Sequence, residues 1–252
     1  MPADDGRLAY DLASQAAGRL LALRACGDDH DVLRKAGDRS SHEFLASELA
    51  RLRPGDAVLS EEGKDDPARL TANWAWIVDP LDGTREFGEP GRTDWAVHVA
   101  LWERGELTAG AVALPAQDRV LSTAEPAPRR AGAARQPLRI VVSRSRPPAF
   151  AARVAEDIGA TLVPLGSAGA KAAAVVLGEA DAYLHDGGQY EWDSAAPVAV
   201  ALAAGLHASR LDGSKLVYNQ ASPWQPDILI CPGKLAHRLL TAVGAVRPTG
   251  TE

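Results

Sequence analysis

The 252-residue chain contains only two cysteines, Cys26 and Cys231, and they lie far apart in the sequence. Small secreted domains usually depend on a dense disulfide framework, which two distant cysteines cannot supply. We therefore expect a protein of a reducing compartment, in which both thiols are small buried apolar side chains.

Long apolar runs and a targeting segment are also missing. The longest apolar stretch, residues 195–206, is interrupted by Pro197 and falls short of the roughly 20 residues that a membrane-spanning helix needs. The chain begins Met-Pro-Ala-Asp-Asp-Gly, without the basic start and apolar core of a secretory signal. These absences predict a soluble, cytoplasmic protein without a membrane span.

Positive charge is in deficit, because 27 lysines and arginines face 33 acidic residues. The chain has no basic stripe of the kind that nucleic-acid-binding proteins carry, so a nucleic-acid polymer is not an expected partner. Its length is sufficient for a full hydrophobic core, in one large domain or two small ones. The expected partner is a small molecule.

The most informative segment is an apolar strand that ends abruptly in acidic residues. Residues 74–78 are rich in aromatic and β-branched types and predict a buried strand, which runs into Asp79-Pro-Leu-Asp82-Gly-Thr84. Two carboxylates at the end of a buried strand suit hard cations, and Mg²⁺ in particular binds oxygen ligands together with substrate phosphate. The alternative is an ordinary turn, which Asp-Gly pairs commonly form and which we expect at Asp212-Gly213.

Two further acidic motifs lie at the ends of predicted buried elements, where sites of α/β proteins collect. The short strand of residues 57–60 leads into Glu61 and Glu62. Downstream, Glu191-Trp192-Asp193 opens an alanine-rich helix. The alternative role for Asp193 is that of a helix N-cap.

Periodicity predicts two amphipathic helices, one near the N-terminus and one after Ser40, followed by an antiparallel meander of strands at residues 95–102, 107–114 and 120–123. Residues 125–137 are rich in proline, alanine and arginine and predict a divide between two halves, 1–125 and 137–252. Strands and helices alternate in the second half, where one strand is expected at residues 180–184. The expected fold class is α/β, with α+β character in the first half.

Together, the Glu61-Glu62, Asp79–Thr84 and Trp192-Asp193 motifs resemble those of the inositol monophosphatase superfamily, whose members are Mg²⁺-dependent, lithium-sensitive phosphomonoesterases. The resemblance covers nearly the whole chain and implies a layered αβαβα sandwich with two sheets. Within the superfamily the chain looks most like the CysQ-type 3'-phosphoadenosine 5'-phosphate phosphatases. Three segments carry this narrower similarity: residues 139–145, with Ser143-Arg144-Ser145; residues 166–171; and residues 190–193.

The resemblance also implies roles for individual residues. Two or three Mg²⁺ ions would be held by Glu61, Asp79, the Leu81 carbonyl, Asp82 and Asp193. Thr84 would orient the attacking water, Asp38 would accept a hydrogen bond from Thr84, and Glu62 would support the ligands. The substrate would be bound by backbone amides of Gly83 and Thr84, by Asp193, and at a second phosphate by Lys171 with Gly166, Ser167, Ser143, Arg144 and Ser145.

Two of these assignments have structural alternatives. The segment before Ser40 lacks the threonine-bearing run of relatives, and Asp38 could instead be a turn residue ahead of a helix that begins with a Ser40–Glu43 capping box. Lys171 could equally be a solvated helix residue.

The resulting hypothesis is a Mg²⁺-dependent hydrolase that removes the 3'-phosphate of 3'-phosphoadenosine 5'-phosphate, a by-product of sulfate assimilation, to give AMP. The alternative is an inositol-1-phosphatase or a fructose-1,6-bisphosphatase, with possible overlap. A non-catalytic regulator would have lost at least one ligand, whereas all five acidic positions, Glu61, Glu62, Asp79, Asp82 and Asp193, are intact. A homodimer is expected from the resemblance and because symmetric dimers are the commonest oligomers of soluble proteins.

Overall fold

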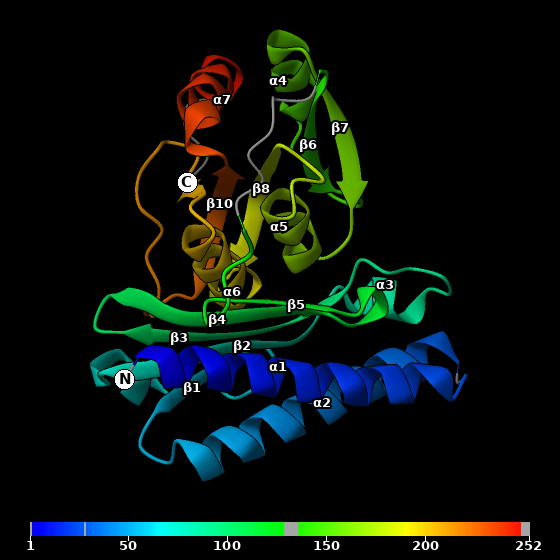
Figure 1. The fold of residues 1–252 in the computed structure, drawn as a ribbon, viewed down its shortest axis with the longest axis vertical. Coiled ribbons are helices and arrows are strands. Elements are labelled where there is room, and N and C mark those ends of the chain that lie inside the picture. Colours follow the sequence, from blue (N-terminus) through cyan, green and yellow to red (C-terminus); the bar gives the residue numbers. More distant parts are fainter. Residues whose placement is uncertain (1, 28, 129–135, 248–252) are drawn as a thin grey trace.

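The computed structural model describes residues 2–27, 29–128 and 136–247. Helices and sheets alternate in five layers (Figure 1). The layers are a helix pair, a sheet, a second helix pair, a second sheet and a third helix pair, with one hydrophobic core at each outer pair and one between the sheets. The predicted αβαβα sandwich is confirmed.

The first sheet has the order β1-β2-β3-β4-β5, with β1 parallel to β2 and all other pairs antiparallel. The predicted meander is therefore correct for β3 to β5. The register of β2 against β3 shifts between Asp79 and Asp82, at the end of β2. Such an irregularity re-aims side chains next to functional sites. The strands are β1 Ala57–Ser60, β2 Trp74–Asp82, β3 Ala96–Glu103, β4 Glu106–Leu114 and β5 Arg119–Ser122.

Two long helices, α1 Pro2–Ala25 and α2 His30–Leu52, cover the outer face of this sheet. The predicted helix start at Ser40 is wrong, because α2 begins at His30 behind an Asp29 N-cap and continues through Ser40. The buried stripe extends back to Leu33 and Gly37, so packing rather than the local capping pattern sets the helix start. Asp38 is consequently a helix residue. The first helix is buried along one face, as its apolar spacing predicts.

The second sheet has the order β7-β6-β8-β10-β9. Strand β6 is parallel to β7 and β8, while β10 is antiparallel to β8 and β9. Strand β8 continues six residues past the predicted end at Leu184, to Tyr190. The strands are β6 Leu138–Ser143, β7 Ala160–Leu165, β8 Ala182–Tyr190, β9 His207–Ser209 and β10 Trp224–Cys231, and the outer helices are α4 Ala151–Ile158 and α7 Gly233–Val246.

Between the sheets lie α5 Ala168–Val176 and α6 Glu191–Ala203. Both helices are alanine-rich, and small side chains let them pack closely against a sheet on either side. Three short helical segments complete the described elements: η1 Pro67–Thr71, α3 Thr84–Gly88 and η2 Pro115–Gln117. The central layer brings the N-terminal end of α6 over β2 and β3 of the first sheet.

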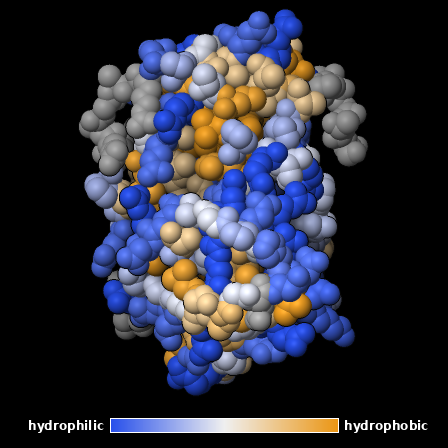
Figure 2. Space-filling view, turned by 90° about the vertical axis from the view of Figure 1, so that its right-hand side faces the viewer, coloured by the Kyte–Doolittle hydropathy of each residue, from blue (hydrophilic) through white to orange (hydrophobic). Residues whose placement is uncertain are grey.

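The predicted divide at residues 125–137 lies largely outside the described residues, because 129–135 are not described. Cys231 is buried, as expected, but Cys26 is exposed, because it follows the last turn of α1. Figure 2 shows a face dominated by hydrophilic residues, with apolar residues gathered mainly in one area of its upper half. None of the helices in the described ranges has the length and apolar character that a bilayer crossing requires.

Candidate active site

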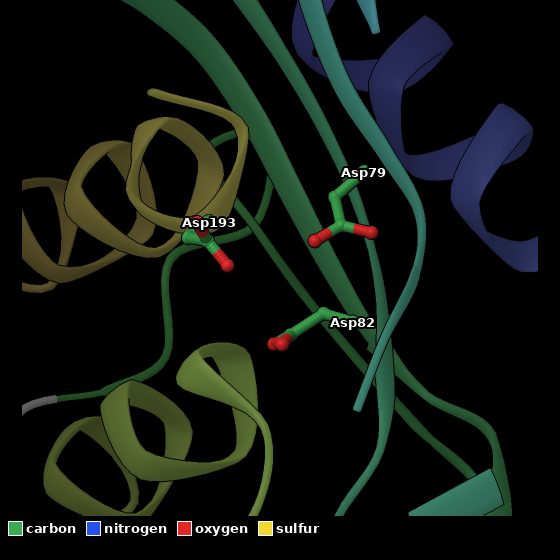
Figure 3. Close-up of side chains that lie close together, drawn as sticks. All are labelled: Asp79, Asp82 and Asp193. Atoms are coloured by element: carbon green, nitrogen blue, oxygen red, sulfur yellow. The ribbon is translucent and has the colours of Figure 1, made fainter. Parts of the chain in front are cut away.

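Three aspartates from two elements face one another beneath the central helix layer (Figure 3). Asp79 and Asp82 stand at the end of β2, and Asp193 stands in the first turn of α6. Each offers a carboxylate oxygen, and these oxygens lie within 4.8 Å of one another. Asp193 is not the helix N-cap, since that position belongs to Tyr190, whose backbone N–H donates to the Asp193 carboxylate at 2.7 Å.

The pKa values show that these carboxylates crowd together. Burial, followed by repulsion from Glu61, Asp82 and Asp193, raises the pKa of Asp79 well above its usual value. Burial, and then the charge of Asp193, raises the pKa of Glu61 to about 7. Burial and Asp82 together raise the pKa of Asp193 to about 6. Like charges at this range favour protonation unless a cation is present.

Asp82 behaves differently from its neighbours. Burial alone would raise its pKa, but His98 and Lys171 outweigh that effect and hold the pKa below the usual value. The His98 Nε2 atom lies 3.1 Å from Asp82 Oδ2. Correspondingly, the Asp82 carboxylate raises the pKa of His98 against the opposing effect of burial. Asp82 is thus kept ionised, as a cation ligand must be.

A donor set made entirely of carboxylate oxygens, with mutual repulsion, fits a hard divalent cation. Glu61 belongs to this set through its interactions with Asp79 and Asp193. The Leu81 backbone carbonyl lies between the two aspartates of β2 and accepts a hydrogen bond from the Thr84 hydroxyl at 3.0 Å. The arrangement can neutralise and orient a phosphate group beside it.

The Thr84 hydroxyl also lies 3.3 Å from Asp38 Oδ1. Burial, and then the nearby charge of Glu62, raises the pKa of Asp38 to about 6. Asp38 reaches this position from within α2, which packs against α3. Gly83 supplies the left-handed backbone (φ +83°) that turns the chain from β2 into α3, a conformation that residues with side chains adopt only with strain.

The carboxylates line one part of a cleft of about 640 Å³. The rest of the lining includes cationic side chains, the backbone of the segment before α5, and aromatic side chains from the end of the β8–β10 pair. The lining residues are Glu61, Asp82, Gly83, Thr84, Arg85, Glu86, Ser143, Ser145, Arg146, Gly166, Ser167, Ala168, Lys171, His185, Gly187, Gly188, Gln189, Tyr190, Asp193 and Trp224.

A second cavity of about 590 Å³ lies along α5 and β7. Its lining includes three alanines of α5 and no member of the carboxylate cluster. Of these two cavities, the carboxylate cleft is the one that contains the clustered aspartates.

The profile of the inositol monophosphatase family matches residues 8–246. The chain belongs to this family. Similar proteins include one of Mycobacterium bovis named 3'-phosphoadenosine 5'-phosphate phosphatase, 54% identical over 237 residues, which cover 90% of this chain and 89% of that protein. The 3'(2'),5'-bisphosphate nucleotidase CysQ of Escherichia coli K12 is 33% identical over 196 residues, covering 73% and 78%.

The fold comparison agrees. The crystal structure of CysQ from Bacteroides thetaiotaomicron, a bacterial member of the inositol monophosphatase family, matches with a TM-score of 0.80 at 26% identity, covering 91% of this chain and 97% of that chain. The predicted family is confirmed, and the chain is a phosphoric monoester hydrolase.

The predicted second-phosphate residues of this family member divide into two groups. Arg144 is not part of the cleft lining, because its guanidinium is paired with Glu86 at 2.7 Å and with Glu89 at 2.9 Å. These partners raise the pKa of Arg144. The other predicted residues of this group, Ser143, Ser145, Gly166, Ser167 and Lys171, line the cleft.

Lys171 is buried rather than solvated. Its ammonium group donates to the Ser167 carbonyl at 2.8 Å and to the Gly166 carbonyl. Burial lowers the pKa of Lys171 to about 8, although Asp82 and Asp193 act in the opposite direction. Two of its three N–H groups are therefore used to hold the segment before α5 in place.

The sequence motifs did not predict the aromatic and arginine groups of the cleft. Tyr190 and Trp224, 43% and 50% exposed, form a rim. The Tyr190 ring stacks on Trp192 at 4.7 Å and meets the Trp224 ring edge-on at 5.6 Å. Arg146 and Arg85 line the cleft without a described ion pair. The signal for the rim was the aromatic pair Tyr190 and Trp192 beside Asp193, but Trp224 reaches it only through the β8–β10 pairing.

Proposed function

We propose that the protein is a Mg²⁺-dependent 3'(2'),5'-bisphosphate nucleotidase that hydrolyses the 3'-phosphate of 3'-phosphoadenosine 5'-phosphate to give AMP and phosphate. One observation supports this substrate most directly. The cleft combines a carboxylate cluster at one part with an exposed aromatic rim and two arginines, Arg85 and Arg146, that have no ion pair among the described residues. A bisphosphate nucleotide needs all three features. The names of the two sequence relatives above agree with this choice.

The cation part of the proposal rests on the carboxylates. Two or three Mg²⁺ ions would be held by the Asp79, Asp82, Asp193 and Glu61 carboxylates and the Leu81 carbonyl. Bound Mg²⁺ supplies charge neutralisation for the attacking and departing oxygens of an in-line displacement.

Asp38 and Thr84 act on the attacking water in this proposal. Ionised Asp38 accepts a hydrogen bond from the Thr84 hydroxyl. The Thr84 oxygen can then accept a hydrogen bond from the attacking water, and this contact aims a lone pair of the water at phosphorus. The water oxygen bonds to phosphorus as the bond to the 3'-oxygen breaks. Of the two protons of that water, one stays on the released phosphate and the other is passed on to the departing 3'-oxygen. Glu62 lies close enough for its charge to raise the pKa of Asp38, and it would support the cation ligands beside it.

The remaining groups would bind the nucleotide. Backbone amides of Gly83 and Thr84 would receive the scissile phosphate. The exposed rings of Tyr190 and Trp224 give the adenine base a stacking surface, and base stacking on aromatic side chains contributes about 1–3 kcal/mol per base. Arg146 and Ser145 would meet the 5'-phosphate, in place of Arg144. Lys171 holds the carbonyls of Gly166 and Ser167 in place and adds positive charge behind them.

A second candidate substrate class is the inositol and sugar phosphates. The carboxylate cluster and the Asp38–Thr84 pair contain nothing that recognises a nucleotide, so this half of the site suits any phosphate monoester. Overlapping activities follow from that shared chemistry.

The test compares phosphate release from 3'-phosphoadenosine 5'-phosphate, inositol 1-phosphate and fructose 1,6-bisphosphate at equal Mg²⁺. We expect kcat/KM to be highest for the nucleotide. A preference for an inositol or sugar phosphate would overturn the nucleotide assignment and leave the phosphatase chemistry intact. The homodimer and the cytoplasmic location are further proposals, and the mass of the purified protein in solution would test the first.

A further inference from the structure

His98 occupies an unusual position in the first sheet. It lies within β3, fully buried, among Ala96, Val97, Val99 and Ala100. An imidazole in such surroundings loses its contact with water and persists only where its nitrogens find partners. Its cross-strand partner is Asp79, so the ring stands directly behind the carboxylate cluster.

Both ring nitrogens of His98 face acceptor oxygens. Nδ1 lies 3.1 Å from the Trp192 backbone carbonyl, which can only accept, so Nδ1 is the donor. Nε2 lies 3.1 Å from Asp82 Oδ2, an ion-pair contact that attracts when the ring carries a proton on both nitrogens. The contact does not have hydrogen-bond geometry, and among the described residues Nε2 has no hydrogen-bonding partner. One ring therefore bridges β2 of the first sheet and the first turn of α6.

The same oxygen of Asp82 accepts two hydrogen bonds. The Ser167 hydroxyl donates to Oδ2 at 2.5 Å, and the Gly169 backbone N–H donates to it at 2.7 Å. With His98 as the third neighbour, Oδ2 is saturated. The other oxygen, Oδ1, is left to face a cation, so these contacts fix which Asp82 oxygen is available.

Gly169 provides the space for this arrangement. A Cβ atom at position 169 would lie only 2.2 Å from His98 Nε2. The neighbouring α5 residues Ala168 and Ala170 are both alanine, a better helix former than glycine. The glycine at this one position is therefore explained by the approach of the ring.

We propose that His98 is a positioning residue for two cation ligands at once. Through Nε2 it fixes the Asp82 carboxylate, and through Nδ1 it holds the Trp192 carbonyl and hence the neighbouring Asp193 at the start of α6. The inference rests on the cation site of the proposed function and adds a residue that touches neither cation nor substrate.

The experiment measures binding of Mn²⁺ alone to the full chain, by electron paramagnetic resonance of free Mn²⁺ and by calorimetry. We expect His98→Leu to raise the Mn²⁺ Kd by about 10- to 100-fold, the usual effect of losing a group that orients a ligand. His98→Gln keeps a donor near the Nε2 position and His98→Asn keeps one near the Nδ1 position. Each should recover part of the loss, whereas leucine recovers none.

His207→Leu is the matched control, because His207 lies on β9 and its ring contacts Ser209 rather than the cleft. It should leave the Kd unchanged. Circular dichroism checks the fold of each variant. If His98→Leu does not fold, Gly169→Ala displaces the ring while keeping the imidazole, and it should weaken Mn²⁺ binding similarly.

The outcomes separate this inference from the function proposed above. Undiminished Mn²⁺ affinity in folded His98→Leu or Gly169→Ala would overturn the positioning role while leaving the cation site in place. Failure of the unaltered protein to bind Mn²⁺ would instead overturn the cation site itself. The inference is supported if His98→Leu loses Mn²⁺ affinity and if His98→Gln or His98→Asn recovers part of it.

Discussion

Asp38 and Thr84 are 46 residues apart in the sequence, yet the Thr84 hydroxyl lies 3.3 Å from the Asp38 carboxylate. The same hydroxyl lies 3.0 Å from the Leu81 carbonyl. Since Thr84 has one hydroxyl proton, it can serve only one of these acceptors at a time. When a cation binds the Leu81 carbonyl, as the proposal requires, Asp38 becomes the acceptor that remains.

This relationship predicts a pH effect on catalysis. The pKa of Asp38 is raised to about 6, so the carboxylate is ionised above that pH and protonated below it. We expect kcat to fall as the pH drops through about 6, because protonated Asp38 no longer accepts the Thr84 proton. Asp38→Asn should lower kcat by about 100-fold or more and remove that part of the pH profile. Thr84→Ser, which keeps the hydroxyl, is the control; a profile unchanged in Asp38→Asn would contradict the assignment.

Asp82→Asn should abolish activity without unfolding the protein. The buried amide can still accept from Ser167, but it carries no charge for the cation. In the unaltered protein, Mg²⁺ at 100 times its Kd should add about 2.7 kcal/mol to the free energy of unfolding, seen as a higher Tm. The variant should lose this increase, and chelation should abolish activity reversibly in the unaltered protein. A variant that still responds to Mg²⁺ would show that Asp82 is not a ligand.

Arg146 and Arg144 should differ in their effect on substrate choice. Removing a charge-assisted hydrogen bond to phosphate costs about 1.5–3 kcal/mol, so Arg146→Ala should lower kcat/KM for 3'-phosphoadenosine 5'-phosphate by roughly 10- to 150-fold. The value for 3'-AMP, which lacks the 5'-phosphate, should barely change. Arg144→Ala frees Glu86 and Glu89 instead, and should affect both substrates alike. If Arg146→Ala lowered kcat/KM equally for both substrates, Arg146 would not be the residue that binds the 5'-phosphate.

Asp227 should govern stability in acid. It is buried and accepts hydrogen bonds from Arg210, Arg247 and the Leu211 backbone. Burial alone would raise its pKa, but these donors hold the pKa below its usual value. Ionised Asp227 therefore adds to the free energy of unfolding above the unfolded-state pKa of about 3.9. This stabilisation is lost as the pH falls through the lower pKa that Asp227 has in the folded state.

Asp227→Asn should reduce the free energy of unfolding at pH 7 by about 2–3 kcal/mol, and the difference from the unaltered protein should narrow in acid. Urea unfolding at pH 7 and pH 3 measures it. Asp212→Asn is the control, because Asp212 is exposed and, within the described residues, its carboxylate accepts a hydrogen bond only from the nearby Ser214. If the difference in the free energy of unfolding were the same at both pH values, the charge of Asp227 would not be what stabilises the fold.

The sequence predicted best what is encoded locally. The Asp79–Thr84 segment identified the end of β2 because the apolar strand and its acidic terminus are contiguous. Asp38 was harder to place, since a local capping pattern at Ser40 competed with a buried stripe that becomes evident only against the sheet.

The remaining parts of the site depend on tertiary partners. Arg144 and Arg146 are chemically identical and two residues apart, and only Glu86 and Glu89 decide which one leaves the cleft. The end of β8 was missed because Gly187-Gly188 resembles a turn in sequence, whereas its pairing with β10 carries the strand to Tyr190. His98 resembles a core position until the approach of Trp192 and Asp82 is known.

The placement of Asp193 on α6, opposite Asp79 on β2, has a consequence for the resistance of the chain to degradation. Without a counter-ion, the three carboxyl groups, within 4.8 Å of one another, repel each other or take up protons, and in neither state do they tie the central helix to the first sheet. With one, the same groups draw the two together. Depletion of divalent cations should thus loosen the junction between the layers and expose it to proteases, so that the protein would be degraded faster where such cations are scarce.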